Sequence, residues 1–287
     1  MAAQTVPPRL ASAIMLLRDA ASGQEQEQGQ GQGKGIEVFM VRRVIQSDFM
    51  PDVYVFPGGS VSADDRAAEQ AEEVCMPVAP AGADPEGRTA LGSGVRAAAI
   101  RELFEEAGVL LAYRVGQMLA IGDEDISRFA GYRQAFNERK GSLVEMAHAE
   151  NLRLATDQLG YFAHWITPEG MPKRFDTHFF ITTAPAEQQA AHDRLETSEG
   201  MWIAPAEALA RSERGEFPLV FATIHQLHEL AAFSTVAEAL ASTTTQHVET
   251  RIPVLVEESG VVRVHLPGDA GNKWVVPEHM TRMRGGN

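Results

Sequence analysis

Residues 101–109 read Arg-Glu-Leu-Phe-Glu-Glu-Ala-Gly-Val, and this stretch decides the fold of the chain. Good helix formers without proline continue upstream of it, so the stretch is predicted to be an α-helix that ends near its glycine. At 3.6 residues per turn, Glu102, Glu105 and Glu106 occupy positions i, i+3 and i+4 and share one face. The helix therefore presents three carboxylates side by side.

Three like charges on one helix face repel each other, at roughly 0.2–0.5 kcal/mol per exposed pair and more when partly buried. A divalent cation would offset this repulsion, because hard cations prefer carboxylate oxygens. Ala98 and Ala99, one turn earlier, are expected to leave room for the ion, whereas Phe104 points the opposite way into a core. Arg101 is expected to pair with Glu105. For the acids alone, a solvated charged face is the commoner explanation.

A second motif makes a cation site a better explanation of these acids than a solvated charged face. Phe56-Pro57-Gly58-Gly59 reads as a strand ended by a turn. With residues 101–109 it resembles the Nudix box, whose second half those nine residues match without a mismatch. The resemblance implies an α/β/α sandwich with a mixed sheet, here with inserted and C-terminal helices. In that family the glutamates of the box hold Mg²⁺ or Mn²⁺ against a diphosphate.

The spacing of the box is unusual. Arg101 lies 42 positions after Gly59, far more than the family's usual spacing, and the sixth position after Gly59 is Asp65 where the family has Glu. Gly87 has the right offset from Arg101, but Ser93 then occupies the position of that Glu, and no Pro-Gly-Gly precedes it. We therefore prefer Gly59 as the opening of a box that an insertion splits.

The resemblance also indicates a substrate class. A split box followed by Phe175-Asp176-Thr177 resembles the branch that includes peroxisomal coenzyme A diphosphatases and many bacterial relatives, which implies hydrolysis of a diphosphate linkage in coenzyme A or acyl-coenzyme A. A Leu-Arg-x-His-x-Gly-Gln signature of coenzyme A enzymes is absent from residues 46–54. Two alternatives stay open: a diphosphatase for NADH, ADP-ribose or another nucleoside diphosphate derivative, and a non-catalytic binding module on the same scaffold.

Site residues follow from the resemblance and from side-chain chemistry. Arginine suits bidentate phosphate contacts, and family members often bring an acid over the site from the region of Glu199, with Glu196 as the other candidate general base. The predicted catalytic residues are Arg101, Glu102, Glu105, Glu106 and Glu199; the predicted metal-binding residues are Gly59, Glu102, Glu105 and Glu106; the predicted substrate-binding residues are Arg42, Arg43, Gly58, Gly59 and Arg174.

The organisation along the chain is predicted as one catalytic domain with additions. Strands are expected at 11–17, 36–44, 54–56, 162–166, 175–183 and 201–204, helices at 205–211, 223–232 and 235–241, and a hairpin at 254–266. The predicted domain spans 8–242, with a flexible loop at 20–35, an insertion without a core of its own at 66–93 and a helical addition at 123–160; residues 243–287 form a C-terminal hairpin and tail.

Composition limits the partners. A net charge of −14 and a pI near 5.1 argue against nucleic acid and anionic membranes, but allow a small diphosphate substrate. The apolar run 10–17 is too short to span a bilayer. With Cys75 alone no intramolecular disulfide can form, which favours a cytoplasmic protein. A homodimer is allowed. The histidines are scattered without metal-site spacing, and we interpret them as core or surface residues.

Overall fold

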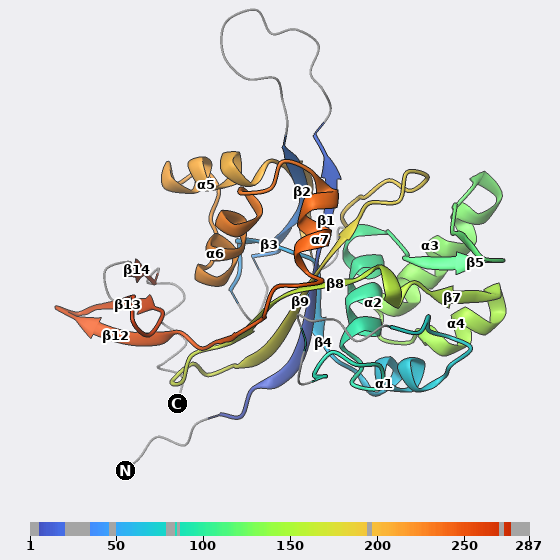
Figure 1. The fold of residues 1–287 in the computed structure, drawn as a ribbon, viewed down its shortest axis with the longest axis horizontal. Helices are drawn as coiled ribbons and strands as arrows, with labels where there is room; N and C mark the ends of the chain where they lie inside the picture. The colour runs from blue at the N-terminus through green and yellow to red at the C-terminus, as the bar shows by residue number, and fades with distance from the viewer. Residues whose placement is uncertain are drawn as a thin grey trace, which may run out of the picture.

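A mixed eight-stranded sheet forms the centre of the computed structural model (Figure 1), which describes residues 6–20, 35–45, 50–78, 84, 87–193, 197–269 and 273–276. Its strand order is β10-β2-β1-β9-β8-β11, with β3 beside β2 and β4 beside β1. β1 runs parallel to β9 and antiparallel to β2 and β4. The strands are β1 (Arg9–Asp19), β2 (Ile36–Arg43), β3 (Tyr54–Val55), β4 (Gly58–Ser60), β8 (Gly160–Ile166), β9 (Phe175–Thr183), β10 (Thr197–Ile203) and β11 (Thr250–Arg251).

Strand β1 shows why the sheet is covered on both faces. Its residues 11–17 are all buried. Because side chains alternate along a strand, Ile14 and Leu16 belong to one hydrophobic core while Met15 and Leu17 belong to the other. A strand that is buried on both faces reads as a continuous apolar run, which is how residues 11–17 read in the sequence.

Helices supply the two covering layers (Figure 1). Among the helices in the described residues, four pack on the face of Ile14 and Leu16, and three on the opposite face. The arrangement confirms the predicted α/β/α sandwich. The first layer contains α1 (Ala63–Gln70), α2 (Val95–Ala107), α3 (Asp123–Asn137) and α4 (Leu143–Glu150); the second contains α5 (Pro205–Glu213), α6 (Phe221–Leu230) and α7 (Val236–Ser242).

Two small antiparallel sheets flank the sandwich, one beside the first helical layer and one at the C-terminal side. The predicted hairpin turns at Ser259-Gly260, both with positive φ, as expected. The first small sheet contains β5 (Ala112–Arg114), β6 (Gln117–Met118) and β7 (Leu152–Leu154), and the second contains β12 (Val254–Glu258), β13 (Val261–His265) and β14 (Trp274–Val275).

Two predicted segments need correction. The insertion 66–93 was predicted to have no core of its own, and it packs into the main core: α1 begins before it at Ala63, and Ala68, Val74 and Cys75 are buried there. The addition 123–160 is helical only as far as α4, because β7 and a 3₁₀ turn at Thr156–Gln158 follow. In each case the packing partners come from distant parts of the chain.

Two further predictions concern the ends of elements. Residues 21–34 of the predicted loop lie outside the described residues, but Ala20 N–H donates to the carbonyl of Gly35 at 2.9 Å and closes the β1–β2 connection. The domain boundary at residue 242 stays a prediction, although β11 lies beyond it and pairs with β8 in the central sheet. Within the described ranges, no helix has the length and apolar character needed to cross a bilayer.

Candidate active site

Helix α2 carries the predicted carboxylates and is bounded by two glycines. Gly94 precedes it with φ 86° and Gly108 follows it with φ 71°, left-handed values that favour glycine. Phe104 is 1% exposed, as predicted for the core face. Ala98 and Ala99 are wholly buried, so the prediction that they leave room for an ion is wrong. Their small side chains instead allow the helix to lie close to its neighbours.

Gly59 brings the chain against the helix. A Cβ built on Gly59 would lie 2.7 Å from Cδ of Glu102, closer than any real Cβ approaches another atom. Gly58 is equally confined, because its Cβ would lie 2.6 Å from the carbonyl oxygen of Ser12 in β1. The Gly58 N–H donates to Oε2 of Glu106 at 3.2 Å. Gly59 is therefore required by its close approach to a box carboxylate, and Gly58 by its close approach to β1.

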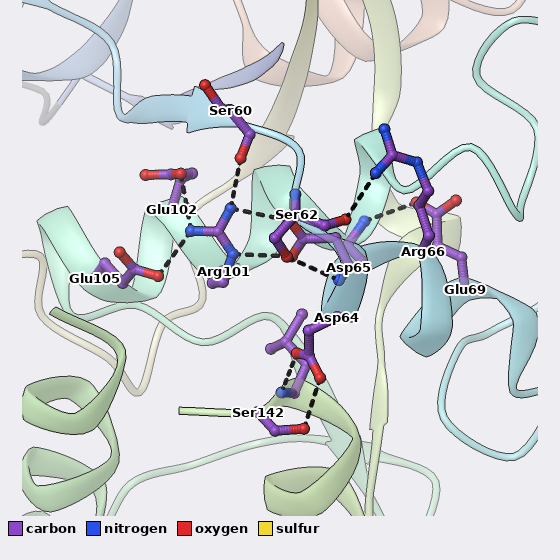
Figure 2. Close-up of polar contacts among 12 residues, drawn as sticks. Ser60, Ser62, Asp64, Asp65, Arg66, Glu69, Arg101, Glu102, Glu105 and Ser142 are labelled. Carbon is purple, nitrogen blue, oxygen red and sulfur yellow. Dashed lines mark hydrogen bonds and ion pairs between the residues drawn. The ribbon is translucent and has the colours of Figure 1, made fainter. Parts of the chain in front are cut away.

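Arg101 joins the two halves of the box (Figure 2). Its guanidinium donates to Oε1 of Glu102 and to Oε1 of Glu105, each at 2.8 Å, and to the carbonyl oxygen of Ser60 at 3.0 Å. The predicted pair with Glu105 is confirmed. The same guanidinium donates to both carboxylate oxygens of Asp65, at 2.8 and 3.0 Å. One arginine thus positions three acids, two on its own helix and one on α1.

The position of Asp65 bears on which glycine opens the box. Asp65 is wholly buried at the start of α1, where Ser62 and Asp65 cap the helix reciprocally, at 2.7 and 3.1 Å. Gly87 is exposed, and a Cβ there would meet nothing within 4 Å. This geometry supports the preference for Gly59 over Gly87, which stays a prediction: an aspartate, one methylene shorter than the family's glutamate, reaches Arg101 from the other side of the insertion.

The electrostatics of the cluster suit a divalent cation. Three carboxylates bond to one guanidinium, so the site carries excess negative charge before any ion binds. Burial raises the pKa of Glu102 to about 7, against the opposing effect of Arg101. Burial alone would lower the pKa of Arg101, but Glu102 and Asp65 raise it above its usual value and keep it charged. Oxygen donors with surplus negative charge fit a hard cation such as Mg²⁺ or Mn²⁺.

A second polar cluster lies on β2, β3 and β10. Glu199 accepts a hydrogen bond from the Tyr54 hydroxyl at 2.6 Å, and Arg42 forms an ion pair with Asp52 at 2.8 Å and lies 3.9 Å from Glu199. Burial and the bond to Glu199 raise the pKa of Tyr54 to about 12. Tyr54, which was not among the predicted site residues, also belongs to the second hydrophobic core. A general-base role for Glu199 and a phosphate contact by Arg42 stay predictions.

The other predicted arginines differ from one another. Arg43 ends β2 and is partly exposed, and its contact with substrate stays a prediction. Arg174 is 8% exposed and donates to the carbonyl oxygens of Thr167 and Val6, each at 2.9 Å. These bonds give Arg174 a structural role that holds the segment before β1 against the start of β9. They argue against the prediction that its guanidinium binds substrate. Glu196 lies outside the described residues.

An apolar cavity of about 180 Å³ lies on the opposite face of the sheet. Trp165 and Phe179 line it from the sheet, Phe221 from α6, and Val264 and Trp274 from the C-terminal strands. These side chains belong to the second hydrophobic core, whereas α2 packs on the first. The cavity and the carboxylates of α2 are therefore on different sides of the sheet.

An α/β/α sandwich in which a Gly-Gly turn and an arginine-centred set of carboxylates meet on one helix defines the class of Nudix hydrolases. A family model described as the NUDT19 Nudix domain matches residues 87–233, which is 147 of the 287 residues. The chain therefore belongs to the NUDT19 Nudix domain family.

Curated relatives match over most of the chain. A Xenopus laevis protein named acyl-coenzyme A diphosphatase NUDT19 is 25% identical over 268 residues, 81% of this chain and 70% of the relative. The Homo sapiens protein of the same name is 26% identical and covers 82% and 72% of the two chains. A solved Nudix hydrolase from Alicyclobacillus acidocaldarius, 23% identical, has a TM-score of 0.64 over 85% of this chain and 98% of its own, which supports the fold.

Proposed function

We propose that this protein hydrolyses the diphosphate linkage of coenzyme A or an acyl-coenzyme A, with Mg²⁺ or Mn²⁺ as cofactor. The observation that carries the proposal is the rejoined box, in which Gly59 lies against Glu102 while Asp65 and the box glutamates share Arg101. The substrate class rests on relatives named acyl-coenzyme A diphosphatase.

Each residue of the box has a distinct part in the proposed reaction. Glu102, Glu105 and Glu106 hold the cation, which when bound neutralises phosphate charge and lowers the pKa of water. Arg101 fixes the rotamers of Glu102 and Glu105 through its two 2.8 Å bonds. Gly58 N–H orients Glu106. Because these groups are bonded before substrate arrives, little reorganisation is needed during the reaction.

The test of the box uses two conservative variants. Glu105→Gln and Glu106→Gln should keep the fold and lower turnover by orders of magnitude, because a charge-stabilising interaction of several kcal/mol is removed. Glu124→Gln on the exposed start of α3 is the matched control and should retain full activity. Rates like those of the unmodified protein in both box variants would rule out this assignment.

The test of the substrate is separate. Coenzyme A should yield 3′,5′-ADP and 4′-phosphopantetheine, identified by mass spectrometry in the presence of Mg²⁺ or Mn²⁺. Dephospho-coenzyme A lacks a phosphate that a cationic side chain such as Arg42 or Arg43 would contact, and charged hydrogen bonds contribute roughly 1.5–3 kcal/mol. Its kcat/KM should therefore fall about tenfold to a hundredfold. Faster cleavage of NADH or ADP-ribose would overturn the substrate and leave the diphosphatase chemistry standing.

A further inference from the structure

A cluster of two histidines and an aspartate lies on strands β8 and β9, away from the box. His164 and His178 are directly opposite each other in the antiparallel pair, and their rings stack with centroids 4.3 Å apart. Asp176 lies two residues before His178, so it projects from the same face of β9. Its Oδ1 is bonded to Nε2 of His164 and lies 3.8 Å from Nε2 of His178. One ligand atom from each residue lies within 4.8 Å of the others.

The remaining ring nitrogens are held by neighbours. Nδ1 of His164 is 2.8 Å from the Thr250 hydroxyl of β11, and Nδ1 of His178 is 3.1 Å from the Tyr161 hydroxyl. Metal-binding histidines commonly have such a partner on the nitrogen that does not face the ion. Here the partners turn both Nε2 atoms toward Asp176.

The two histidines of the cluster are buried, whereas its aspartate is partly exposed to solvent. His164 and His178 are each 3% exposed, while the side chain of Asp176 is 30% exposed. The buried imidazoles are rigid because their strands and second-nitrogen bonds fix them. The partly exposed side chain of Asp176 gives the cluster access to solvent.

We propose that His164, Asp176 and His178 form a second divalent-cation site, of the class that binds Zn²⁺ through two imidazole nitrogens, one carboxylate oxygen and a water. Two nitrogen ligands and one oxygen ligand suit a borderline-soft ion such as Zn²⁺, whereas the all-oxygen box suits Mg²⁺ or Mn²⁺. Ser12 of β1 pairs with Gly59 on one side and with His178 on the other. The backbones of Gly59 and His178 are therefore about 10 Å apart, two strand spacings.

The positive charge of Arg88, which lies near the cluster, disfavours the binding of a cation. Its Nη1 donates to the Thr250 hydroxyl oxygen at 2.8 Å, which places the guanidinium behind that hydroxyl. A neutral His164 has one ring proton, and in the absence of an ion Nε2 donates it to Asp176. With an ion on Nε2 that proton would be on Nδ1 and be donated to the Thr250 oxygen, which can accept from both partners. The imidazole stays neutral as a ligand must, and the carboxylate of Asp176 supplies the negative charge of the site.

An ion bound here would link three strands at one edge of the central sheet. Its ligands lie on β8 and β9, and Thr250 extends the network to β11, which pairs with β8. An ion would thus stabilise the C-terminal part of the sheet without contacting the box. This predicts that Zn²⁺ raises the thermal stability of the full chain even when Mg²⁺ saturates the box.

The experiment counts bound Zn²⁺ on the full chain. Protein freed of metal with a chelator is saturated with Mg²⁺, dialysed against micromolar Zn²⁺ and analysed by atomic emission. The unmodified protein should bind one equivalent more than His164→Gln or His178→Gln, and Zn²⁺ should raise its Tm but not theirs. His228→Gln, on an exposed position of α6, is the matched control and should behave like the unmodified protein.

Two further measurements distinguish loss of the ion site from misfolding of a variant. Asp176→Asn keeps the size of the side chain and should also lose the extra equivalent. Co²⁺ bound to the unmodified protein should give the visible absorption of histidine coordination and lose it on adding Zn²⁺. Equal Zn²⁺ in all variants, or loss of the equivalent in Glu105→Gln instead, would overturn the proposal, as would Co²⁺ without that absorption.

Discussion

At the scale of single residues, the box depends on the absence of a Cβ at Gly59 as much as on the charges of its carboxylates. Glu102 and Gly59 are so close that only a hydrogen fits where other residues carry Cβ. Glu102 has to stay in the rotamer that Arg101 holds at 2.8 Å. A methyl group at position 59 would therefore act on catalysis by displacing a carboxylate that it does not chemically alter.

The prediction for Gly59→Ala is a loss of turnover of at least about a hundredfold, because small misplacements of catalytic groups have effects of that size. Gly131→Ala on α3 is the control, since its Cβ would meet nothing within 4 Å. It should be neutral or stabilising by up to about 1 kcal/mol, because alanine is the better helix former. Activity assays and thermal unfolding on both variants provide the comparison. Near-normal turnover in Gly59→Ala would show that Glu102 tolerates displacement.

Glu102 also predicts a pH dependence. Its pKa is raised by burial from 4.5 to about 7, so the folded state binds more protons between these values than the unfolded state. Its contribution to stability is therefore present below the lower value and lost as pH rises through about 7. With a chelator present, the free energy of unfolding of Glu102→Gln should rise relative to that of the unmodified protein as pH increases from 5 to 8. The relative increase should be on the order of 1–3 kcal/mol. Urea unfolding measures this, and parallel pH profiles of the two proteins would contradict it.

Some residue roles were visible in the sequence and others were not. The spacing of Glu102, Glu105 and Glu106 places them on one helix face by local geometry alone. His164 and His178 meet only because β8 and β9 pair in one register, so their separation along the chain gave no metal-site spacing. Arg174 looked suited to phosphate, and its two carbonyl partners lie in segments that sequence could not bring to it.

At the scale of elements, the segment that splits the box also supports it. Glu69 of α1 is 4% exposed and accepts four backbone hydrogen bonds, from residues 92, 94, 96 and 97, at 2.7–2.9 Å. Residues 94–97 form the beginning of α2, whose first N–H groups have no partner within the helix. A carboxylate from α1 therefore caps α2, together with Ser93, whose hydroxyl oxygen accepts from the Val95 N–H at 3.5 Å.

Glu69→Gln should destabilise the protein by about 1–3 kcal/mol, because the amide nitrogen cannot accept and leaves buried N–H groups unpaired. The same variant should lower turnover, since α2 carries the box. Glu72→Gln, an exposed position just after α1, is the control and should change neither property. Chemical unfolding and activity assays on the pair test the idea, which fails if both variants lose the same stability.

Elements were predictable where the signal was local. The strand predicted at 175–183 coincides with β9, and the helix predicted at 205–211 lies within α5. The insertion could not be assigned, because Ala68, Val74 and Cys75 are too few and too spaced to show a periodic pattern. Replacement of residues 68–90 by a short linker is expected to unfold the protein, since those side chains and Glu69 would leave the core.

At the scale of the whole molecule, the described chain beyond residue 242 adds strand β11 to the central sheet. Val248 is 3% exposed in the core beneath α2, and Gln246 donates to the carbonyl of Phe162 at 3.0 Å. Arg251 of β11 forms an ion pair with Glu229 of α6. A short strand at the edge of a sheet has little local signal, which is why the predicted domain ended at 242.

Two truncations test where the catalytic domain ends. A chain that ends at residue 253 keeps β11 and Val248 but loses the C-terminal hairpin, whose Val264 covers the second core. It should fold with a lower Tm. A chain that ends at 242 also exposes the edge of β8 and leaves a cavity where Val248 packed, and deletions of buried side chains of that size destabilise by roughly 2–5 kcal/mol. It should be insoluble or largely unfolded. Soluble yield and thermal unfolding measure both, and equal stability of the two chains would place the boundary at 242 after all.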